Sequence, residues 1–286
     1  MTAPKKNTKK RSTAVRNQSA EEVKRNLRGE AKRMHTAAVR ETVVRKSRKT
    51  PGDSYAPPEN IITSTLGELI QGVRTIPEDQ QERMGFTQDG GFGAKLWMAG
   101  DVSLVKQPCV AIVGARDVSS GGAARSRRLA RELARAGVVV VSGLAKGVDT
   151  AALTAAMEAK GRTIAVIGTP ITRAYPAENK RLQEKIYREH LLVSQFAPDK
   201  RVYPSNFPER NKLMAAITDA TVIIEASDES GSLHQGAECT RLGRWLFIAK
   251  SLAENPTLRW PQNFLLYPTT RVLHQTSDIL DVLRVN

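Results

Sequence analysis

Short runs of aliphatic and β-branched residues alternate with longer Ala/Leu/Arg-rich stretches over residues 105–250. Runs that are apolar at every position are typical of strands buried on both faces of a sheet. The strands are expected at Val110–Val113, Val138–Val141, Thr163–Ile167, Leu191–Val193, Thr221–Glu225 and Trp245–Ile248. The helices are expected at Gly121–Ala136, Asp149–Lys160, Glu178–Arg188, Lys212–Asp219 and Gln235–Leu242.

This alternation of strands and helices predicts the fold class. Strands joined through helices form a parallel sheet by right-handed crossovers. We therefore expect an α/β protein with a Rossmann-like, doubly wound, mostly parallel sheet. One more strand and helix are expected within Asn263–Leu283.

The chain before this region has a different pattern. Residues 1–58 are predicted to form a basic arm, which consists of a disordered start, a marginal helix over about residues 20–47 and a Pro-rich linker. Ser19 and Glu22 fit a capping box at the start of that helix. Residues 59–94 are expected to be a short helical lead-in, and the Rossmann-like domain is expected over 95–286.

The net charge of the chain indicates the kind of partner it binds. At +15 it favours an anionic partner, with nucleic acid more expected than a membrane surface. The 286 residues are 40% hydrophobic, which suffices for a core and excludes a wholly disordered chain. Residues 1–50 hold 16 Lys and Arg against 4 Asp and Glu, a net +12. Residues 51–286 hold the remaining 28 Lys and Arg (44 − 16) and 25 Asp and Glu (29 − 4), a net +3. Most of the positive charge therefore lies in the arm. The arm is expected to be either a non-specific tether for DNA or only a solvated extension.

Several classes of site have no support in the sequence. Cys109 and Cys239 show neither a disulfide framework nor metal-ligand spacing, and we expect both to be small buried residues. No metal site is expected, and because Walker and GxGxxG motifs are missing, no cofactor is expected either. Signal-peptide and membrane-spanning patterns are also missing, so a cytoplasmic protein with no membrane partner is expected.

Three Gly/Ser-rich turns follow predicted strands and lead into helices. In such sheets ligands bind at the carboxyl ends of the strands, where glycines allow close approach and helix N-termini attract anions. The turns therefore predict a phosphate site, although each one alone is also an ordinary strand-to-helix connection. Their candidate residues are Gly114, Arg116, Ser119, Ser142, Gly143, Lys146, Ser230, Gly231 and Ser232.

Two further features favour single-stranded nucleic acid as the ligand. Arg116 directly follows a predicted strand and its Gly–Ala turn, where its forked donors suit a phosphate, unless it is a surface or structural charge. Phe207, Arg210, Asn211 and Lys212 join an aromatic ring to two cations at a predicted loop-to-helix junction. Cations neutralise a backbone while a ring stacks on a base, although Phe207 also fits a core position.

These motifs together resemble a known family. Six motifs follow in the order seen in the DNA-processing protein A (DprA/Smf) family: residues 109–116 (CVAIVGAR), 138–153 (VVVVSGLAKGVDTAAL), 162–168 (RTIAVIG), 175–179 (YPAEN), 207–218 (FPERNKLMAAIT) and 230–238 (SGSLHQGAE). The resemblance covers about residues 95–280 and implies a Rossmann-like homodimer that binds and protects single-stranded DNA without catalysis. It also implies delivery of that DNA to the RecA recombinase during natural transformation or other DNA uptake.

By the same resemblance, Arg116, Arg210 and Lys212 contact phosphates. Lys146, the Ser142–Gly143 turn and the residues 230–232 line the same basic pocket.

Two other functions stay open. The related LOG-type phosphoribohydrolases carry a glutamate in a similar glycine-rich turn, and Glu238 stands at that position here. The alternative is therefore a nucleotide-processing enzyme in which Glu238 assists cleavage of an N-glycosidic bond. The remaining alternative is a nucleotide-sensing or defence-associated scaffold that uses the same pocket.

Overall fold

The structure is a computed structural model that describes residues 54–84 and 95–285. The disordered start and the basic helix, both expected before residue 48, lie outside these ranges, so both stay predictions. The division of the chain at residues 58 and 94 also stays a prediction.

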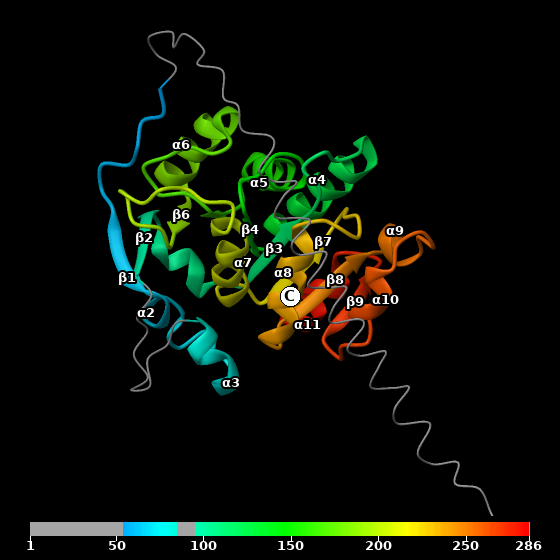
Figure 1. Cartoon of the computed structure of the whole chain (residues 1–286). Helices are drawn as coiled ribbons and strands as arrows, with labels where there is room; N and C mark the ends of the chain where they lie inside the picture. Colours follow the sequence, from blue (N-terminus) through cyan, green and yellow to red (C-terminus); the bar gives the residue numbers. More distant parts are fainter. Residues whose placement is uncertain (1–53, 85–94, 286) are drawn as a thin grey trace, which may run out of the picture. The chain divides into compact units, whose positions relative to one another are not determined.

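A nine-stranded sheet forms the centre of the molecule, in the order β1-β2-β6-β5-β4-β3-β7-β8-β9 (Figure 1). The seven strands β3 to β9 run parallel to one another. Strand β2 pairs antiparallel with β6, and β1 pairs antiparallel with β2 and forms one edge of the sheet. The parallel strands are β3 (Cys109–Val113), β4 (Val139–Ser142), β5 (Thr163–Ile167), β6 (Leu191–Ser194), β7 (Ala220–Ile223), β8 (Trp245–Ala249) and β9 (Thr270–Leu273); the edge strands are β1 (Ile62–Thr65) and β2 (Lys95–Gly100).

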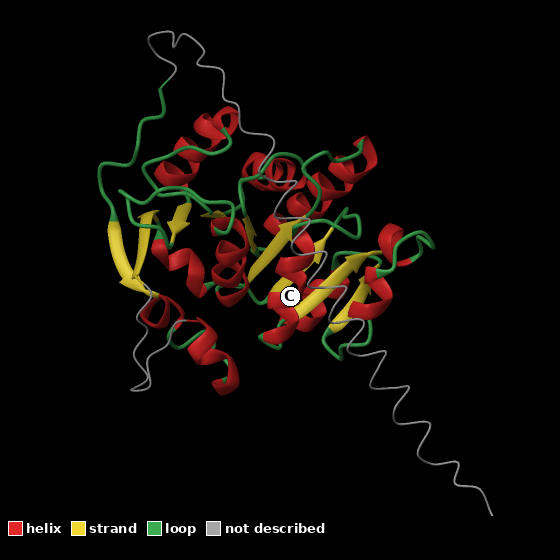
Figure 2. Ribbon diagram, viewed as in Figure 1, coloured by secondary structure: helices red, strands yellow, loops and turns green. Residues whose placement is uncertain are grey.

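Helices cover both faces of this sheet (Figure 2). Alternate residues of each central strand point to opposite faces, as Val222 and Ile223 of β7 do, and each face meets its own helices. One face packs against α4 (Ser120–Arg135), α5 (Val148–Glu158), α6 (Lys180–Glu189) and α11 (Ser277–Leu283). The other packs against α2 (Leu66–Ile70), α7 (Asn206–Ala216), α8 (Ser232–Arg241), α9 (Lys250–Ala253) and α10 (Trp260–Phe264). The short helix α3 (Glu78–Gln81) follows α2.

The predicted α/β class and the six central strands are confirmed, with ends that differ by at most two residues. The start of α7 was predicted wrongly. The helix begins at Asn206, six residues before the expected Lys212, because Pro208 lies in its first turn, where a proline needs no backbone donor. Strand β1 was not expected, and it adds a strand beyond β2 at the edge of the sheet.

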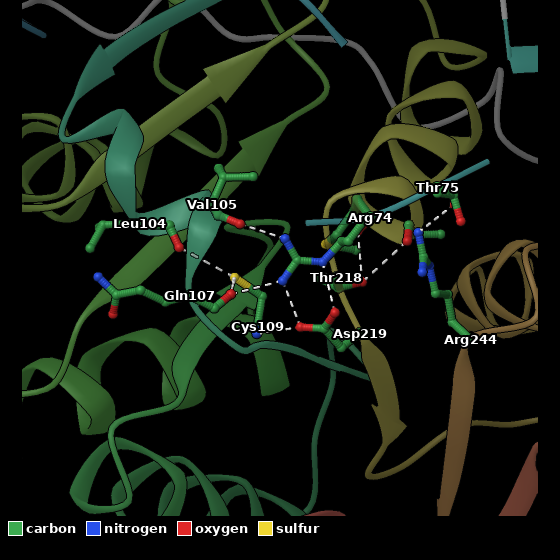
Figure 3. Close-up of polar contacts among 11 residues, drawn as sticks. Arg74, Thr75, Leu104, Val105, Gln107, Cys109, Thr218, Asp219 and Arg244 are labelled. Carbon is green, nitrogen blue, oxygen red and sulfur yellow. Dashed lines mark hydrogen bonds and ion pairs between the residues drawn. The ribbon is translucent and has the colours of Figure 1, made fainter. Parts of the chain in front are cut away.

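At the amino ends of the strands, Arg74 is buried in a closed polar network (Figure 3). Its guanidinium forms a bidentate ion pair with Asp219, through Nε at 2.8 Å and Nη2 at 2.6 Å, and also donates to the carbonyls of Val105 and Gln107. Asp219 in turn accepts from the Cys109 amide at 2.8 Å. The network therefore ties the lead-in segment to the starts of β3 and β7.

Both cysteines are buried and unpaired, as expected. Burial raises the pKa of the Cys109 thiol to about 12. None of the helices in the described ranges has the length and apolarity that a bilayer crossing requires.

Candidate nucleic-acid interface

The topology predicts a binding site where the order of strands reverses. From β3 the chain winds outward through β4, β5 and β6, and it then returns to place β7 on the other side of β3. The carboxyl ends of β3 and β7 therefore open a crevice between their turns. A cleft of about 880 Å³ occupies this position, and its walls include the turns after β3 and β7 and the start of α7.

The turn after β3 presents Arg116 to the cleft. Gly114 is needed there because a Cβ would lie 2.7 Å from Val148 Cγ2 and 2.8 Å from the Glu225 carbonyl oxygen. The Ala115 amide donates to that same carbonyl at 2.7 Å, which holds the turn against the end of β7. The next residue, Arg116, is exposed, and within the described residues its guanidinium has neither a hydrogen bond nor an ion pair.

Aromatic rings lie beside Arg116. Its guanidinium lies over the Phe207 ring, with Cζ 5.8 Å from the centroid. The Tyr175 ring is 5.3 Å from that of Phe207 and 47% exposed. Arg116, Lys146, Tyr175, Phe207 and Arg210 line a small recess of about 50 Å³, which we call the basic–aromatic recess. The recess lacks a carboxylate among its described lining residues.

Ser119 is not free to bind a phosphate. Its hydroxyl donates to Glu225 Oε2 at 2.5 Å and accepts from the Gly122 amide, and its own amide donates to Glu225 Oε1 at 2.8 Å. The Glu225 carboxylate thus occupies the N-terminus of α4, where an external anion was expected. The prediction that the Ser119 hydroxyl contacts a phosphate was wrong, since this hydroxyl caps α4 and donates to Glu225.

The turn after β4 divides into a buried part and an exposed part. Ser142 is fully buried and donates to the Ile112 carbonyl at 2.7 Å, so its predicted place in the pocket wall was wrong. Gly147 has a φ of 75°, and a side chain there would collide with the carbonyls of Ala115 and Arg116. Lys146 is exposed and pairs with Glu178 at 2.9 Å, and this carboxylate raises the pKa of Lys146.

Arg210 holds the strand ends together from within the wall. It is 7% exposed, and its Nη1 donates to the Gly143 carbonyl at 2.6 Å and the Val166 carbonyl at 2.7 Å. Burial lowers the pKa of Arg210, which the Asp149 carboxylate opposes, and burial raises the pKa of Asp149. Asp149 accepts from the amides of Gly143 and Ala145. Direct contact of Arg210 with phosphate stays a prediction, beside this structural role.

The helical phase of α7 separates the remaining residues of that motif. Phe207 and Asn211 are one turn apart and both line the cleft. Lys212 lies on another side of α7, where it pairs with Glu209 at 2.9 Å and lines a separate cavity of about 310 Å³ beside Trp97. The expectation that Lys212 shares the pocket with Arg116 was therefore wrong.

The turn after β7 supplies hydroxyls to the cleft. Ser230, Gly231 and Ser232 all line it, as expected. The Ser230 hydroxyl accepts from the Ser227 amide at 2.8 Å, whereas the Ser232 hydroxyl is buried without a hydrogen-bond partner among the described residues. The Asn211 side-chain amide lies 3.5 Å from the Gly231 carbonyl oxygen, which links this turn to α7.

The charge of the cleft differs from the expectation of a basic pocket. The described lining contains Arg116, Arg125 and Arg210 against the carboxylates of Asp117, Asp149, Glu225 and Glu229. The described lining of the basic–aromatic recess contains Arg116, Lys146 and Arg210 and no carboxylate residue, although Lys146 pairs with Glu178 beside it. Sequence analysis missed Tyr175 as a member of this recess, although it belongs to the YPAEN motif at residues 175–179.

Glu238 does not face the cleft. It is buried on α8, and its two carboxylate oxygens pair with Arg83 and Arg241, each at 2.6 Å. The residue on which the phosphoribohydrolase alternative depends thus joins α8 to the lead-in segment. Groups of three His, Cys, Asp or Glu arranged to hold a metal ion are not found in residues 54–84 and 95–285.

Comparisons with known proteins agree on one family. A family model described as DNA recombination-mediator protein A matches residues 91–284. DNA processing protein DprA of Streptococcus pneumoniae is 41% identical over 152 residues, which cover 53% of this chain and 54% of that protein. DprA of Bacillus subtilis is 30% identical over 215 residues, which cover 74% of this chain and 72% of that protein. The chain thus matches about half of the pneumococcal relative's length.

Two solved structures are also similar. The crystal structure of DNA processing protein A from Streptococcus pneumoniae has a TM-score of 0.63 and 31% identity, over 78% of this chain and 74% of that one. A structure of DNA processing protein A from Helicobacter pylori, described for its single-stranded DNA binding mode, has a TM-score of 0.61 and 26% identity. It covers 78% of this chain and 95% of that one.

Proposed function

The chain belongs to the DNA recombination-mediator protein A family, and we propose that it binds single-stranded DNA at the carboxyl ends of β3 and β4. One observation carries the proposal: Arg116 is exposed and has no ion-pair partner in the described residues, while it lies over Phe207 and next to Tyr175. An arginine without an ion-pair partner in the described residues, beside the exposed Tyr175 ring and the half-buried Phe207 ring, supplies the two contacts that single-stranded DNA needs.

The chemistry of the basic–aromatic recess suits DNA of any sequence. The Arg116 guanidinium donates to a phosphate in a forked geometry, and Lys146 supplies a second positive charge. The exposed ring of Tyr175 accepts a base by stacking, which every base allows, while the half-buried Phe207 ring supports the Arg116 guanidinium. The single-stranded DNA binding of the Helicobacter pylori relative supports this proposal.

The biological role is proposed on the family resemblance. The protein protects incoming single-stranded DNA and delivers it to the RecA recombinase during transformation-type DNA uptake. It acts without catalysis, as a homodimer, in the cytoplasm where RecA and the incoming strand meet. A pull-down of RecA with the full chain tests the proposed contact with RecA.

Substitution of Arg116 tests the site. In fluorescence anisotropy with a labelled oligothymidylate, Arg116→Ala is expected to weaken binding by about tenfold or more and to reduce the salt slope by about 0.7, the value for one lost phosphate contact. Arg181→Ala, which removes an exposed arginine from α6, is the matched control and is expected to bind like the wild type. Equal binding by the wild type and Arg116→Ala overturns the site assignment.

The phosphoribohydrolase alternative has a separate test. Incubation with nucleoside monophosphates is expected to release no free base. Release of base that Glu238→Gln abolishes establishes the enzyme instead. The position of Glu238, paired with two arginines and away from the described lining of the cleft, supports the DNA-binding proposal.

A further inference from the structure

We propose that a stripe of arginines along α4 carries the bound single-stranded DNA out of the cleft and over the adjacent helical face. The stripe consists of Arg125, Arg128, Arg131 and Arg135. This inference rests on the proposed function, because it extends the path of the same ligand. It adds a second contact surface that lies outside the strand-end turns.

The spacing of the stripe is that of one helix face. Its members follow at steps of three, three and four residues, so each lies about one turn, 5.4 Å, from the next. The opposite side of α4 is buried through Gly122, Ser126, Leu129, Ala130 and Leu133. The stripe therefore faces solvent and presents one cation per turn over about 15 Å.

The stripe begins in the cleft itself. Arg125 lines the cleft, and its Nη2 lies 3.5 Å from Glu225 Oε2. From this point α4 leads away from the carboxyl ends of the strands, on the outer layer beside α5 (Figure 1). A strand that leaves the cleft past Arg125 thus meets Arg128 next.

Only weak internal pairs compete for these cations. Arg128, with a side chain 73% exposed, is 3.5 Å from Glu132, and Arg131, 40% exposed, is 3.0 Å from Glu158. Exposed pairs of this kind contribute little energy, so a phosphate replaces them readily. Glu132 is also held by a hydrogen bond from Thr276 of the segment before α11. Arg135 has no ion pair within the described residues.

The far end of the stripe continues into a second basic turn. Gly161 packs so closely on α4 that a Cβ at this position would lie 3.1 Å from Ala134 Cα. The turn around Gly161 carries Lys160 and Arg162, both exposed. Positive charge therefore extends beyond the end of α4, toward the amino end of β5.

The composition of this face favours nucleic acid over a membrane. A helix that binds a membrane surface needs large apolar side chains beside its cations. The large exposed hydrophobic side chains of the described residues are Ile62, Val73, Tyr175, Tyr203, Leu266 and Tyr267, and none belongs to α4. A linear series of single charges, continuous with the cleft, instead suits a backbone with one charge per nucleotide.

The test removes the three arginines of the stripe that lie outside the described lining of the cleft. The triple variant Arg128→Gln/Arg131→Gln/Arg135→Gln of the full chain keeps Arg125, and glutamine keeps the helix propensity. Its matched control, Arg181→Gln/Lys185→Gln/Arg188→Gln, removes the same charge from α6. Binding is measured with oligothymidylates of about 6 and about 20 nucleotides, at several salt concentrations.

The stripe variant is expected to bind the long oligonucleotide about tenfold more weakly at low salt, with a salt slope smaller by about 2, the sum for three phosphates. It is expected to bind the short one like the wild type, and the α6 control is expected to bind both normally. Equal losses in both triple variants, or unchanged binding of the long oligonucleotide, overturn the inference alone. Absence of binding by the wild type itself overturns the proposed function and this inference with it.

Discussion

The two ends of the sheet use arginine in opposite ways. At the amino ends, Arg74 is buried, and Asp219 and two backbone carbonyls bind its guanidinium from fixed directions. At the carboxyl ends, Arg116 is exposed, and its described neighbours offer it an aromatic face but no acceptor. The first arrangement holds three segments of chain together, whereas the second leaves the donors of the guanidinium for a ligand.

Arg210 stands between these two cases. It belongs to the binding cleft by position, yet two strand-end carbonyls bind its Nη1 as they would in a structural network. Position at the carboxyl ends is therefore not enough to assign an arginine to a ligand. The acceptors already bound to each guanidinium decide between structure and binding.

The largest effect is expected from Arg74. Arg74→Ala leaves the Asp219 carboxylate and two carbonyls without their donor, so the free energy of unfolding is expected to fall by about 3–5 kcal/mol, the usual loss for half of a buried ion pair. Urea denaturation measures this change in the free energy of unfolding. Arg116→Ala is the matched variant at the other end, with an expected change within about 0.5 kcal/mol. Similar losses in the two variants remove the proposed difference between the ends of the sheet.

Arg210 is expected to give the next largest change. Arg210→Gln is expected to lower the free energy of unfolding by about 2–3 kcal/mol, because the Gly143 and Val166 carbonyls lose a shared donor. Arg210→Lys keeps the charge but not the forked geometry. If Arg210→Gln unfolds at the wild-type urea concentration but no longer binds DNA, then Arg210 belongs with Arg116 as a ligand contact.

The aromatic part of the recess is expected to affect binding alone. Tyr175→Leu removes an exposed stacking face, and one base–aromatic stack is worth about 1–3 kcal/mol, so affinity for oligothymidylate is expected to fall about tenfold. Tyr203→Leu is the control, since Tyr203 is 55% exposed and lies outside the described lining of the recess. Equal losses of affinity in the two tyrosine variants argue against a stacking site at the recess.

The smallest effect concerns His190, which lies directly before β6 at the amino ends. Burial lowers its pKa from the ordinary value of 6.5, so the folded chain favours the neutral ring. The unfolded chain binds more protons just below pH 6.5, and stability is therefore full above that pH and falls as the pH drops toward the folded-state pKa. The free energy of unfolding, measured by urea denaturation on both sides of pH 6.5, is therefore expected to be lower on the acid side. His190→Gln should flatten that difference, and an unchanged pH dependence contradicts this assignment.

The central fold was predictable from sequence because buried parallel strands form unbroken apolar runs. The run at residues 163–167 matches β5 at both ends. Strand β1, Ile62–Thr65, contains two threonines and a serine, and half of its residues are exposed, so it shows no such run. Its pairing with β2 depends on the tertiary contact and not on local pattern.

The candidate site was predictable only in part, because side-chain direction depends on phase and partners. Arg116 and residues 230–232 line the cleft as the turn chemistry indicated. Lys212 lies on another side of α7 than predicted, because the helix begins at Asn206. A proline is typical of a helix end or interruption, so Pro208 did not indicate a helix that had already begun. Ser119 and Ser142 were misassigned since Glu225 and the Ile112 carbonyl, both distant in sequence, accept their hydrogen bonds.

Photo-crosslinking reports where the bases of a bound strand lie on the protein. The full chain is irradiated with an oligothymidylate that carries bromodeoxyuridine, and mass spectrometry locates the adducts. Adducts are expected on Tyr175 and Phe207, and Arg116→Ala is expected to remove most of them. Adducts confined to residues outside the basic–aromatic recess, and unchanged in Arg116→Ala, contradict the account.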